Sequence, residues 1–255
     1  SIKVLEKKLN QPLFIRSTKK VQLTPEGEIL LKHIEPAMNL IKKGENQLLE
    51  AHTLNGGQLR IGASDTICRY YLVPYLNRFH KEFPNIHIKV INQTSIECAK
   101  FLENGQADFI VANYPNSALA GSMNTRVINE FHDVFVASRS AFPLKGSKLA
   151  LEELLRYPIM MLDRKSTTSE FLHQVFQKSQ LDLVPEIELS SNDLLIDLAR
   201  IGLGIAFVPD FCIPKNDEDL FILDLKEQLP SRQMMVAYNE SLPVSQAARQ
   251  FMDML

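Results

Sequence analysis

The sequence predicts an α/β fold of two sheet-containing units, preceded by a long helix and a small basic module. From about residue 57 onward, short apolar strand candidates alternate with helical segments, a pattern typical of a mostly parallel sheet covered by helices on both faces. Residues 24–51 carry apolar side chains at helical spacing, and positive charge gathers in residues 1–20. The 255 residues are enough for two or three compact units.

The first 23 residues read as a helix followed by a basic hairpin. SIKVLEKKL places its apolar residues on one helical stripe, and Asn10 suits a left-handed C-cap. Apolar residues 13–15 and 21–23 then flank a basic tip. Residues 1–20 hold six basic residues and one acid, so they carry +5 within a chain of net charge −2. This pattern suits a winged helix-turn-helix on DNA, and a solvated helix face is the alternative. The candidate DNA contacts are Lys3, Lys7, Arg16, Ser17, Lys19 and Lys20.

A helix of about 28 residues is predicted to follow. Thr24 is a suitable N-cap, and Pro25 stands at the first helical position. The apolar residues repeat with a period near 3.5, which is typical of a helix that pairs with another. The alternative is a linker helix that packs on its own chain. The residues expected at the seam are Leu30, Ile34, Ile41 and Leu48.

Beyond a polar joint at residues 52–57, about nine strands are expected over about 200 residues, which fits two units better than one. The strand candidates are 59–63, 86–92, 107–112, 133–138, 158–162, 185–189, 205–208, 220–225 and 234–238. The helix candidates are 66–83, 95–104, 150–156, 167–180, 192–201 and 243–255.

Four strand-to-helix junctions are rich in hydroxyl groups. They are Ser64-Asp65-Thr66, Thr94-Ser95, Ser166-Thr167-Thr168 and Ser190-Ser191-Asn192. Ligands in open α/β sheets sit at such junctions, where helix N-termini offer free N–H groups. Each junction is also explained by ordinary helix capping, and the two roles are compatible. Hydroxyls and N–H groups favour a small carboxylate or oxyanion, with Arg69, Arg164 and Lys165 as candidate cations.

Other functional classes have little support. Cys68, Cys98 and Cys212 lie in apolar surroundings and are interpreted as packed thiols, and no spacing typical of a metal site occurs. Ser64 is followed by Asp65 and Thr66, so the nucleophile pattern GxSxG fails at its last position. Asp65 and Asp163 could be imagined as an acid–base pair, but no sequence feature supports that role. No cofactor and no enzymatic activity are expected. No secretory leader and no long apolar run are present, so a cytoplasmic chain without membrane contact is predicted.

Residues 5–31, LEKKLNQPLFIRSTKKVQLTPEGEILL, resemble the end of the DNA-binding domain of LysR-type transcriptional regulators. The matching residues are Leu5, Glu6, Leu9, Leu13, Phe14, Arg16, Leu23, Thr24 and Gly27. Asn10 stands where the family usually has Gly. The resemblance places Ser1 inside the recognition helix. Two later segments, FLENGQADFIV (101–111) and DLARIGLGIAFVP (197–209), resemble the family's two-lobed, type 2 periplasmic-binding-protein-like effector domain.

This resemblance implies a division of the chain and a set of partners. Residues 1–23 would end the winged helix-turn-helix, 24–56 would form the dimerisation helix and joint, 57–129 with 233–255 the first lobe, and 130–232 the second. The implied partners are double-stranded promoter DNA, a small-molecule effector, a second copy in a homodimer or dimer of dimers, and RNA polymerase. The effector would contact Ser64, Thr94, Ser95 and Thr167 or Thr168, and Asn113 and Phe131 are added by position. The alternative is a two-lobed solute-binding or ligand-sequestering protein without DNA binding.

Overall fold

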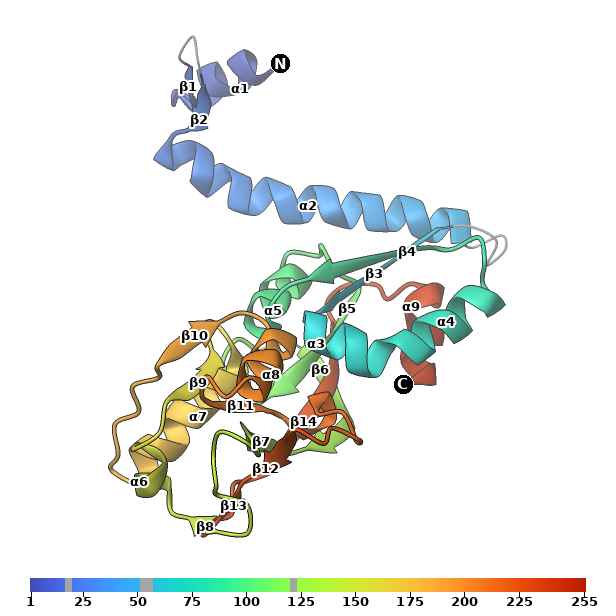
Figure 1. Cartoon of the computed structure of the whole chain (residues 1–255). Coiled ribbons are helices and arrows are strands. Elements are labelled where there is room, and N and C mark those ends of the chain that lie inside the picture. The colour runs from blue at the N-terminus through green and yellow to red at the C-terminus, as the bar shows by residue number, and fades with distance from the viewer. Residues whose placement is uncertain (17–19, 51–56, 120–122) are drawn as a thin grey trace.

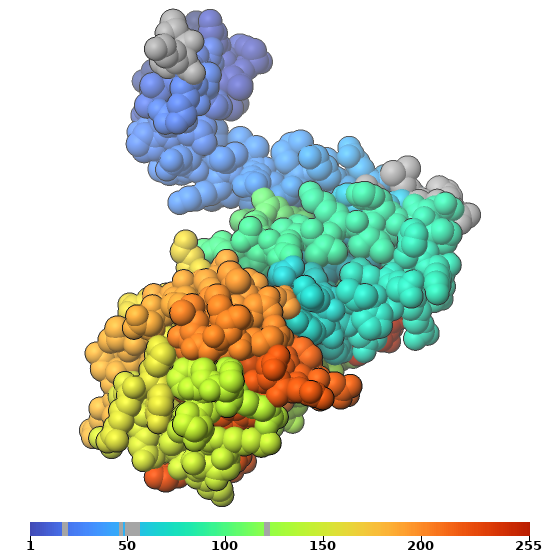
Figure 2. Space-filling model, viewed as in Figure 1, coloured from blue at the N-terminus to red at the C-terminus, as the bar shows by residue number. Residues whose placement is uncertain are grey.

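The computed structural model describes residues 1–16, 20–50, 57–119 and 123–255. A small N-terminal unit stands at one end of a long helix, α2 (Pro25–Glu50), which lies along the first of two α/β lobes (Figure 1). The space-filling view shows the N-terminal unit projecting clear of both lobes (Figure 2). Within the described residues, no helix combines the length and apolar character that a membrane span needs.

The N-terminal unit contains helix α1 (Ile2–Leu9) and an antiparallel hairpin of β1 (Phe14–Arg16) and β2 (Val21–Leu23). Asn10 ends α1 in the left-handed region with φ 50°, as predicted. The Glu6 carboxylate joins the helix to the hairpin, because its Oε1 accepts from the backbone N–H groups of Leu13 (2.9 Å) and Phe14 (3.2 Å). Ser17 and Lys19, two predicted DNA contacts, lie outside the described residues.

The Leu-Thr-x-x-Gly segment fixes the start of α2. Thr24 Oγ1 donates to the carbonyl of Pro12 (2.7 Å) and accepts from the N–H of Gly27 (3.0 Å), so the predicted cap is formed. A Cβ atom at Gly27 would lie 2.2 Å from the carbonyl oxygen of Leu13. Glycine is therefore required at this close approach between helix and hairpin.

One side of α2 packs on the first lobe. Asn39 Nδ2 donates to the carbonyl of Asn104 (2.9 Å), and Lys43 is buried with its Nζ 4.0 Å from Asp108 Oδ1. The predicted seam faces elsewhere: Leu30 is half-buried, and the other three seam residues are exposed, namely Ile34, Ile41 and Leu48. The helix thus packs on its own chain, as the alternative held, and still presents a separate apolar face.

The first lobe is built on a sheet with strand order β4-β3-β5-β14-β6. Its strands are β3 (Gln58–Ala63), β4 (His87–Asn92), β5 (Phe109–Tyr114), β6 (Met123–Phe131) and β14 (Arg232–Asn239). Its helices are α3 (Asp65–Ile67), the π-helix η1 (Cys68–Leu72), α4 (Val73–Glu82), α5 (Ser95–Glu103) and α9 (Gln246–Met254). Apolar residues pack on both faces of the sheet, against α4 and α9 on one face and α5 on the other.

The second lobe repeats this architecture with strand order β10-β9-β11-β7-β12. Its strands are β7 (Asp133–Ser138), β9 (Ile159–Leu162), β10 (Ile187–Leu189), β11 (Ile205–Pro209) and β12 (Leu220–Ile222), with a small separate pair, β8 (Lys148–Leu149) and β13 (Asp224–Leu225). Its helices are α6 (Leu151–Leu154), α7 (Thr167–Lys178), α8 (Asn192–Arg200) and the 3-10 helix η2 (Asp210–Cys212). The α7 and α8 helices cover opposite faces of the sheet.

The prediction of mostly parallel sheets is confirmed, with one exception in each lobe. In each lobe four of the five strands run in one direction, and one strand, β14 in the first lobe and β7 in the second, runs against both of its neighbours. The reason is the connectivity: β14 enters the first sheet from the second lobe and lies between β5 and β6. Alternation of strands and helices along the chain does not reveal such a crossing strand.

The boundaries of several elements also differ from the expectation. Strand β6 was not predicted, because seven of its nine positions are polar or only partly buried at the edge of the sheet. The single helix expected at 66–83 is divided by the π-helical turn η1. The strand expected at 220–225 divides into β12 and β13, which pair with different strands.

Candidate functional site

A cavity of about 250 Å³ lies between the two lobes. It is slightly smaller than the ~300–1,000 Å³ typical of drug-sized ligand sites, so it suits a small metabolite. The first lobe contributes Ser64, Asp65, Thr66, Asn92, Gln93, Thr94, Ser95 and Asn113 to its lining. The second lobe contributes Leu162, Asp163, Ser166, Thr167, Thr168, Ser190 and Asn192.

Strand register brings these residues together. In the first lobe Ala63, the last residue of β3, pairs with Asn92 and with Val111, so β3, β4 and β5 end at one edge of the sheet. In the second lobe Leu162 pairs with Leu189, so β9 and β10 end together. Helices begin directly after these strand ends, and their first turns face the space between the lobes.

The predicted capping role is confirmed at all four junctions. Each cap hydroxyl accepts from the N–H group three residues further on: Ser64 Oγ from Ile67 (3.3 Å), Thr94 Oγ1 from Glu97 (3.3 Å), Ser166 Oγ from Ser169 (3.1 Å) and Ser191 Oγ from Leu194 (3.3 Å). A cap of this kind satisfies one of the N–H groups that the first turn leaves without a helical partner. The first two N–H groups of each helix remain available for another acceptor.

Two other hydroxyls join separate segments. Ser95 Oγ accepts from the backbone N–H of Asn113 (3.1 Å), which ties the start of α5 to the end of β5. Thr66 Oγ1 accepts from Asn192 Nδ2 (2.9 Å), and this hydrogen bond crosses from the first lobe to the second. The cavity wall is therefore held by specific polar contacts on both sides.

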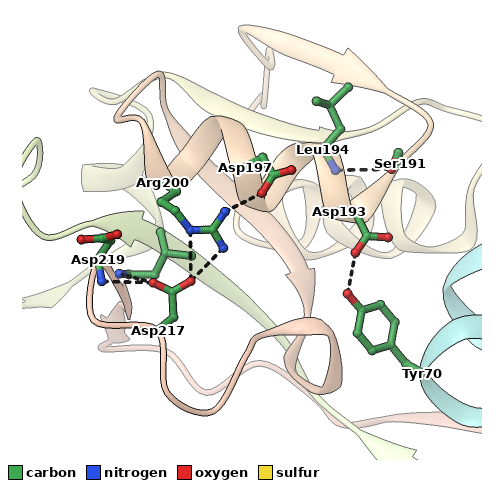
Figure 3. A network of polar contacts seen from close by, with 9 residues as sticks. Tyr70, Ser191, Asp193, Leu194, Asp197, Arg200, Asp217 and Asp219 are labelled. Carbon is green, nitrogen blue, oxygen red and sulfur yellow. Dashed lines mark hydrogen bonds and ion pairs between the residues drawn. The ribbon is translucent and has the colours of Figure 1, made fainter.

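A second contact between the lobes lies beside the cavity. The Tyr70 hydroxyl donates to Asp193 Oδ1 (2.5 Å), and Arg69 Nη1 lies 3.5 Å from Asp193 Oδ2. Burial and the hydrogen bond to Asp193 both raise the pKa of Tyr70. Figure 3 shows this contact together with polar contacts further along α8, where Arg200 pairs with Asp217 (2.8 Å).

The structure adds a buried charge that was not predicted. Arg232, at the start of β14, pairs through Nη1 with Asp133 Oδ2 at 2.7 Å, and both side chains are fully buried. Its Nη1 also donates to Thr168 Oγ1 (3.1 Å), and its Nη2 donates to Thr167 Oγ1 (2.9 Å). Burial raises the pKa of Asp133, and Arg232 acts in the opposite direction. A basic residue at the start of an apolar strand was the available sequence signal.

Some predicted residues lie outside the cavity. Phe131 is buried against Phe211, with ring centroids 5.2 Å apart, because it belongs to the apolar core of the first lobe. Ser191 caps α8 but is not part of the lining, whereas its neighbours Ser190 and Asn192 are. The other ten predicted effector contacts line the cavity, as does Asn192 of the fourth predicted junction, whereas Asn92, Gln93, Leu162 and Asp163 were not predicted as contacts.

The candidate cations also lie elsewhere. Among the described residues, no Lys, Arg or His lines the cavity, since Arg69 pairs with Asp193 and neither Arg164 nor Lys165 is part of the wall. Asp65 and Asp163 do line it, so the two carboxylates share one cleft. Asp65 Oδ1 accepts from Asn92 Nδ2 (3.2 Å), and Asp163 Oδ1 accepts from the N–H of Lys165 (3.0 Å). Both carboxylates therefore hold local structure.

The thiols have the character of packed side chains. Cys98 and Cys212 are buried and Cys68 is half-buried. Burial raises the pKa of Cys68 to about 11 and that of Cys98 to about 12, so both favour the neutral thiol. Among the described residues, no group of three His, Cys, Asp or Glu side chains is arranged to hold a metal ion.

The basic residues of the N-terminal unit lie far from the cavity. Lys3 and Lys7 are exposed on α1, and Arg16 Nη2 lies 3.8 Å from Glu6 Oε2 at the start of the hairpin loop. Lys20 directly precedes β2. They belong to the N-terminal unit, which projects from the two lobes (Figure 2).

Comparison with known proteins identifies relatives of the whole chain. The family model described as LysR substrate binding domain matches residues 52–255. A probable RuBisCO transcriptional regulator of Cyanidioschyzon merolae is 27% identical over 256 residues, which covers 98% of this chain and 84% of the relative. The HTH-type transcriptional activator CmpR of Synechocystis sp. is 25% identical and covers 100% of this chain and 83% of CmpR.

A solved structure shares the fold of the two lobes. The regulatory domain of Synechocystis PCC6803 CcmR, determined in complex with 2-PG, superimposes with a TM-score of 0.70 at 21% identity, over 77% of this chain and 94% of that domain. The named relatives are regulators of transcription, which favours that class over an enzyme or a solute-binding protein.

Proposed function

The chain belongs to the family of LysR substrate-binding domains, and we propose that a small anionic effector binds between its lobes and changes its hold on promoter DNA. It is a LysR-type transcriptional regulator and not an enzyme. The observation that carries the proposal is the cavity between the lobes, where capped helix N-termini from both lobes meet. A ligand that contacts both walls binds one arrangement of the lobes better and shifts the equilibrium toward it.

The chemistry of the wall favours an oxyanion or carboxylate. Free N–H groups in the first turn of a helix attract negative charge, and hydroxyls add donors without a formal cation. CcmR, which shares the fold, was solved with 2-PG, and that compound is the first probe to try here. The proposed contacts are Ser64, Asp65, Thr66, Thr94, Ser95, Asn113, Ser166, Thr167, Thr168 and Ser190. Asp65 would contribute its backbone N–H group in the first turn of α3, because its carboxylate accepts from Asn92 and would repel an anion.

We assign DNA contact to the projecting N-terminal unit. The exposed lysines of α1 and the hairpin residues around Arg16 and Lys20 supply positive charge for phosphates. Accordingly, residues 1–23 are the end of the DNA-binding domain, 24–56 the linker, 57–129 with 233–255 the first lobe, and 130–232 the second. A protein with this role works in the cytoplasm, beside the chromosome, and RNA polymerase is a further proposed partner.

The exposed apolar face of α2 supports self-association. The side chains of three seam residues are largely exposed to solvent: Ile34 is 41% exposed, Ile41 55% and Leu48 72%. They lie on one face of α2, and their spacing along the sequence is typical of helices that pair. A second copy of α2 would cover them and would place two N-terminal units side by side. We therefore propose a homodimer, or a dimer of dimers, as the form that binds DNA.

The anion site is tested by thermal unfolding of the protein with 2-PG, phosphate, sulfate and simple carboxylates. We expect at least one anion to raise the unfolding temperature of the wild type in a saturable way. Ser190→Trp, which fills the cavity from its rim, should abolish this shift. Val184→Trp is the matched control, because Val184 is 79% exposed and lies outside the cavity lining. An undiminished shift in Ser190→Trp would place the anion elsewhere.

A further inference from the structure

Arg232 lies where the chain passes between the lobes. It is the first residue of β14, which returns to the first lobe, and it pairs in the sheet with Phe131, the last residue of β6. Asp133, its ion-pair partner, is the first residue of β7 in the second lobe. The guanidinium therefore joins both crossing segments, and it lies 5.4 Å from the ring centre of Phe131 and 5.2 Å from that of Phe171.

The buried pair is poorly suited to a purely stabilising role. Arg232 Nε and Asp133 Oδ1 have no hydrogen-bond partner among the described residues. A buried ion pair recovers its desolvation cost only when its remaining polar atoms are also satisfied, and apolar residues of similar volume often stabilise such a site equally well. Stabilisation by the ion pair alone therefore does not explain why Arg232 is buried here, and its other contacts indicate a further role.

The other contacts of Arg232 are the hydroxyls of Thr167 and Thr168, which open α7 and line the cavity. A guanidinium has donors and no acceptor, so each threonine oxygen must accept the hydrogen bond. Each hydroxyl then keeps its own proton to donate to another group. Contact with Arg232 thus leaves both hydroxyls as hydrogen-bond donors toward any further partner.

Hydroxyls on the opposite wall have the same polarity. Ser64 and Thr94 accept from helix N–H groups, Thr66 accepts from the Asn192 amide, and Ser95 accepts from the N–H of Asn113. Their protons are likewise left to donate. A ligand oxygen that only accepts hydrogen bonds, as in an oxyanion, is complementary to these hydroxyls. The two carboxylates of the lining, Asp65 and Asp163, accept from Asn92 Nδ2 and from the N–H of Lys165.

We propose that Arg232 is a positioning residue of the effector site, which holds the hydroxyls of Thr167 and Thr168 as donors toward the cavity and so selects for an oxyanion. The inference rests on the proposed function and deepens it. Because Arg232 begins the crossing strand β14, it also connects Thr167 and Thr168 of the cavity lining to the segment that joins the lobes.

The test is isothermal titration of the protein with 2-PG, phosphate and sulfate, in wild type and variants. Thr167→Val/Thr168→Val removes both hydroxyls with little change in shape, and we expect it to weaken the tightest anion about tenfold or more. Thr167→Ser/Thr168→Ser keeps both hydroxyls and should restore most of the affinity. Arg232→Lys should weaken binding similarly, and Arg156→Lys, at an exposed position, is its control.

The combined variant separates positioning from simple structural support. If Arg232 acts through the two hydroxyls, adding Arg232→Lys to the double valine variant should cause no further loss of affinity. Should Arg232→Lys fail to fold, as judged by near-ultraviolet circular dichroism, Arg232→Gln, which keeps N–H donors at this position, takes its place in the same comparison.

Three results would overturn the inference. Full anion affinity in the double valine variant would show that the hydroxyls do not contact the ligand. Losses that add independently for Arg232 and the threonines would show that Arg232 acts only on the fold. A wild type that binds none of the anions would remove the proposed anion site, and this inference with it, which distinguishes that failure from the first two.

Discussion

Single hydroxyl groups serve both the fold and the candidate site. Ser64, Thr94 and Ser166 each cap a helix and line the cavity. Their capping could be predicted because a cap depends on residues three positions apart. Arg232 could not be predicted, because its partners Asp133 and Thr167 lie 99 and 65 positions away in the chain. Local chemistry is visible in the sequence, whereas contacts made by the fold are not.

Lys43 allows a residue-scale prediction about pH. Burial holds its pKa below 10.5, Asp108 acts to raise it and Arg60 to lower it. The unfolded chain therefore binds this proton more strongly, and the contribution of Lys43 to stability improves as pH rises toward 10.5. We expect the free energy of unfolding of the wild type, relative to Lys43→Met, to increase between pH 7 and 10.5 in urea titrations.

The control for this prediction is Lys42→Met, because Lys42 is the exposed neighbour of Lys43 on α2. The difference in free energy of unfolding between Lys42→Met and the wild type should change less with pH than the difference between Lys43→Met and the wild type. A difference for Lys43→Met that falls or stays constant as pH rises would contradict the buried position of the Lys43 ammonium group.

At the scale of elements, strongly patterned segments were predicted well and edge segments poorly. The spacing of apolar residues located α2, and buried apolar runs located β3, β7 and β11 within one residue at each end. Strand β6 was missed because an edge strand has few buried side chains and so lacks the alternation that marks a strand. The division of 66–83 by η1 was missed because a π-helical turn leaves no strong signal in composition.

The exposed face of α2 leads to a prediction about assembly. Ile41→Glu places a charge on the proposed seam, and burial of that charge in a helix pair is costly. We expect sedimentation velocity to show a smaller species for this variant than for the wild type. Lys42→Glu, one position away and off the seam, should leave the assembly unchanged. An unaltered assembly in Ile41→Glu would exclude the seam as the interface.

At the scale of the whole molecule, the two-lobed architecture and the convergence of hydroxyl-rich junctions were predicted from the resemblance and the strand ends. The order of strands was not predicted. The chain crosses between the lobes twice, and β14, which follows the second lobe in the chain, lies between β5 and β6 in the first sheet. The walls of the cavity follow from strand ends, whereas the contacts of Arg232 with the lining residues Thr167 and Thr168 depend on that crossing.

The projecting N-terminal unit predicts how salt affects DNA binding. Replacing Arg16 and Lys20 by Ala should weaken binding and reduce the slope of log affinity against log salt concentration by about one for each lost phosphate contact. Fluorescence anisotropy on a promoter fragment over a range of salt concentrations measures this slope. Arg139→Ala/Lys145→Ala, on the distant second lobe, is the charge-matched control. An unchanged slope in Arg16→Ala/Lys20→Ala would remove the hairpin from the DNA interface.

The link between the cavity and DNA is tested most directly by measuring the affinity for the best-binding anion with and without saturating promoter DNA. Coupling between two binding sites is reciprocal, so an anion that alters DNA binding must itself bind differently when DNA is present. We predict a change of about five-fold or more for the wild type, in the same ratio as the change in DNA affinity with and without the anion. Equal anion affinities in the two conditions, for an anion that Ser190→Trp fails to bind, would contradict the proposed regulation.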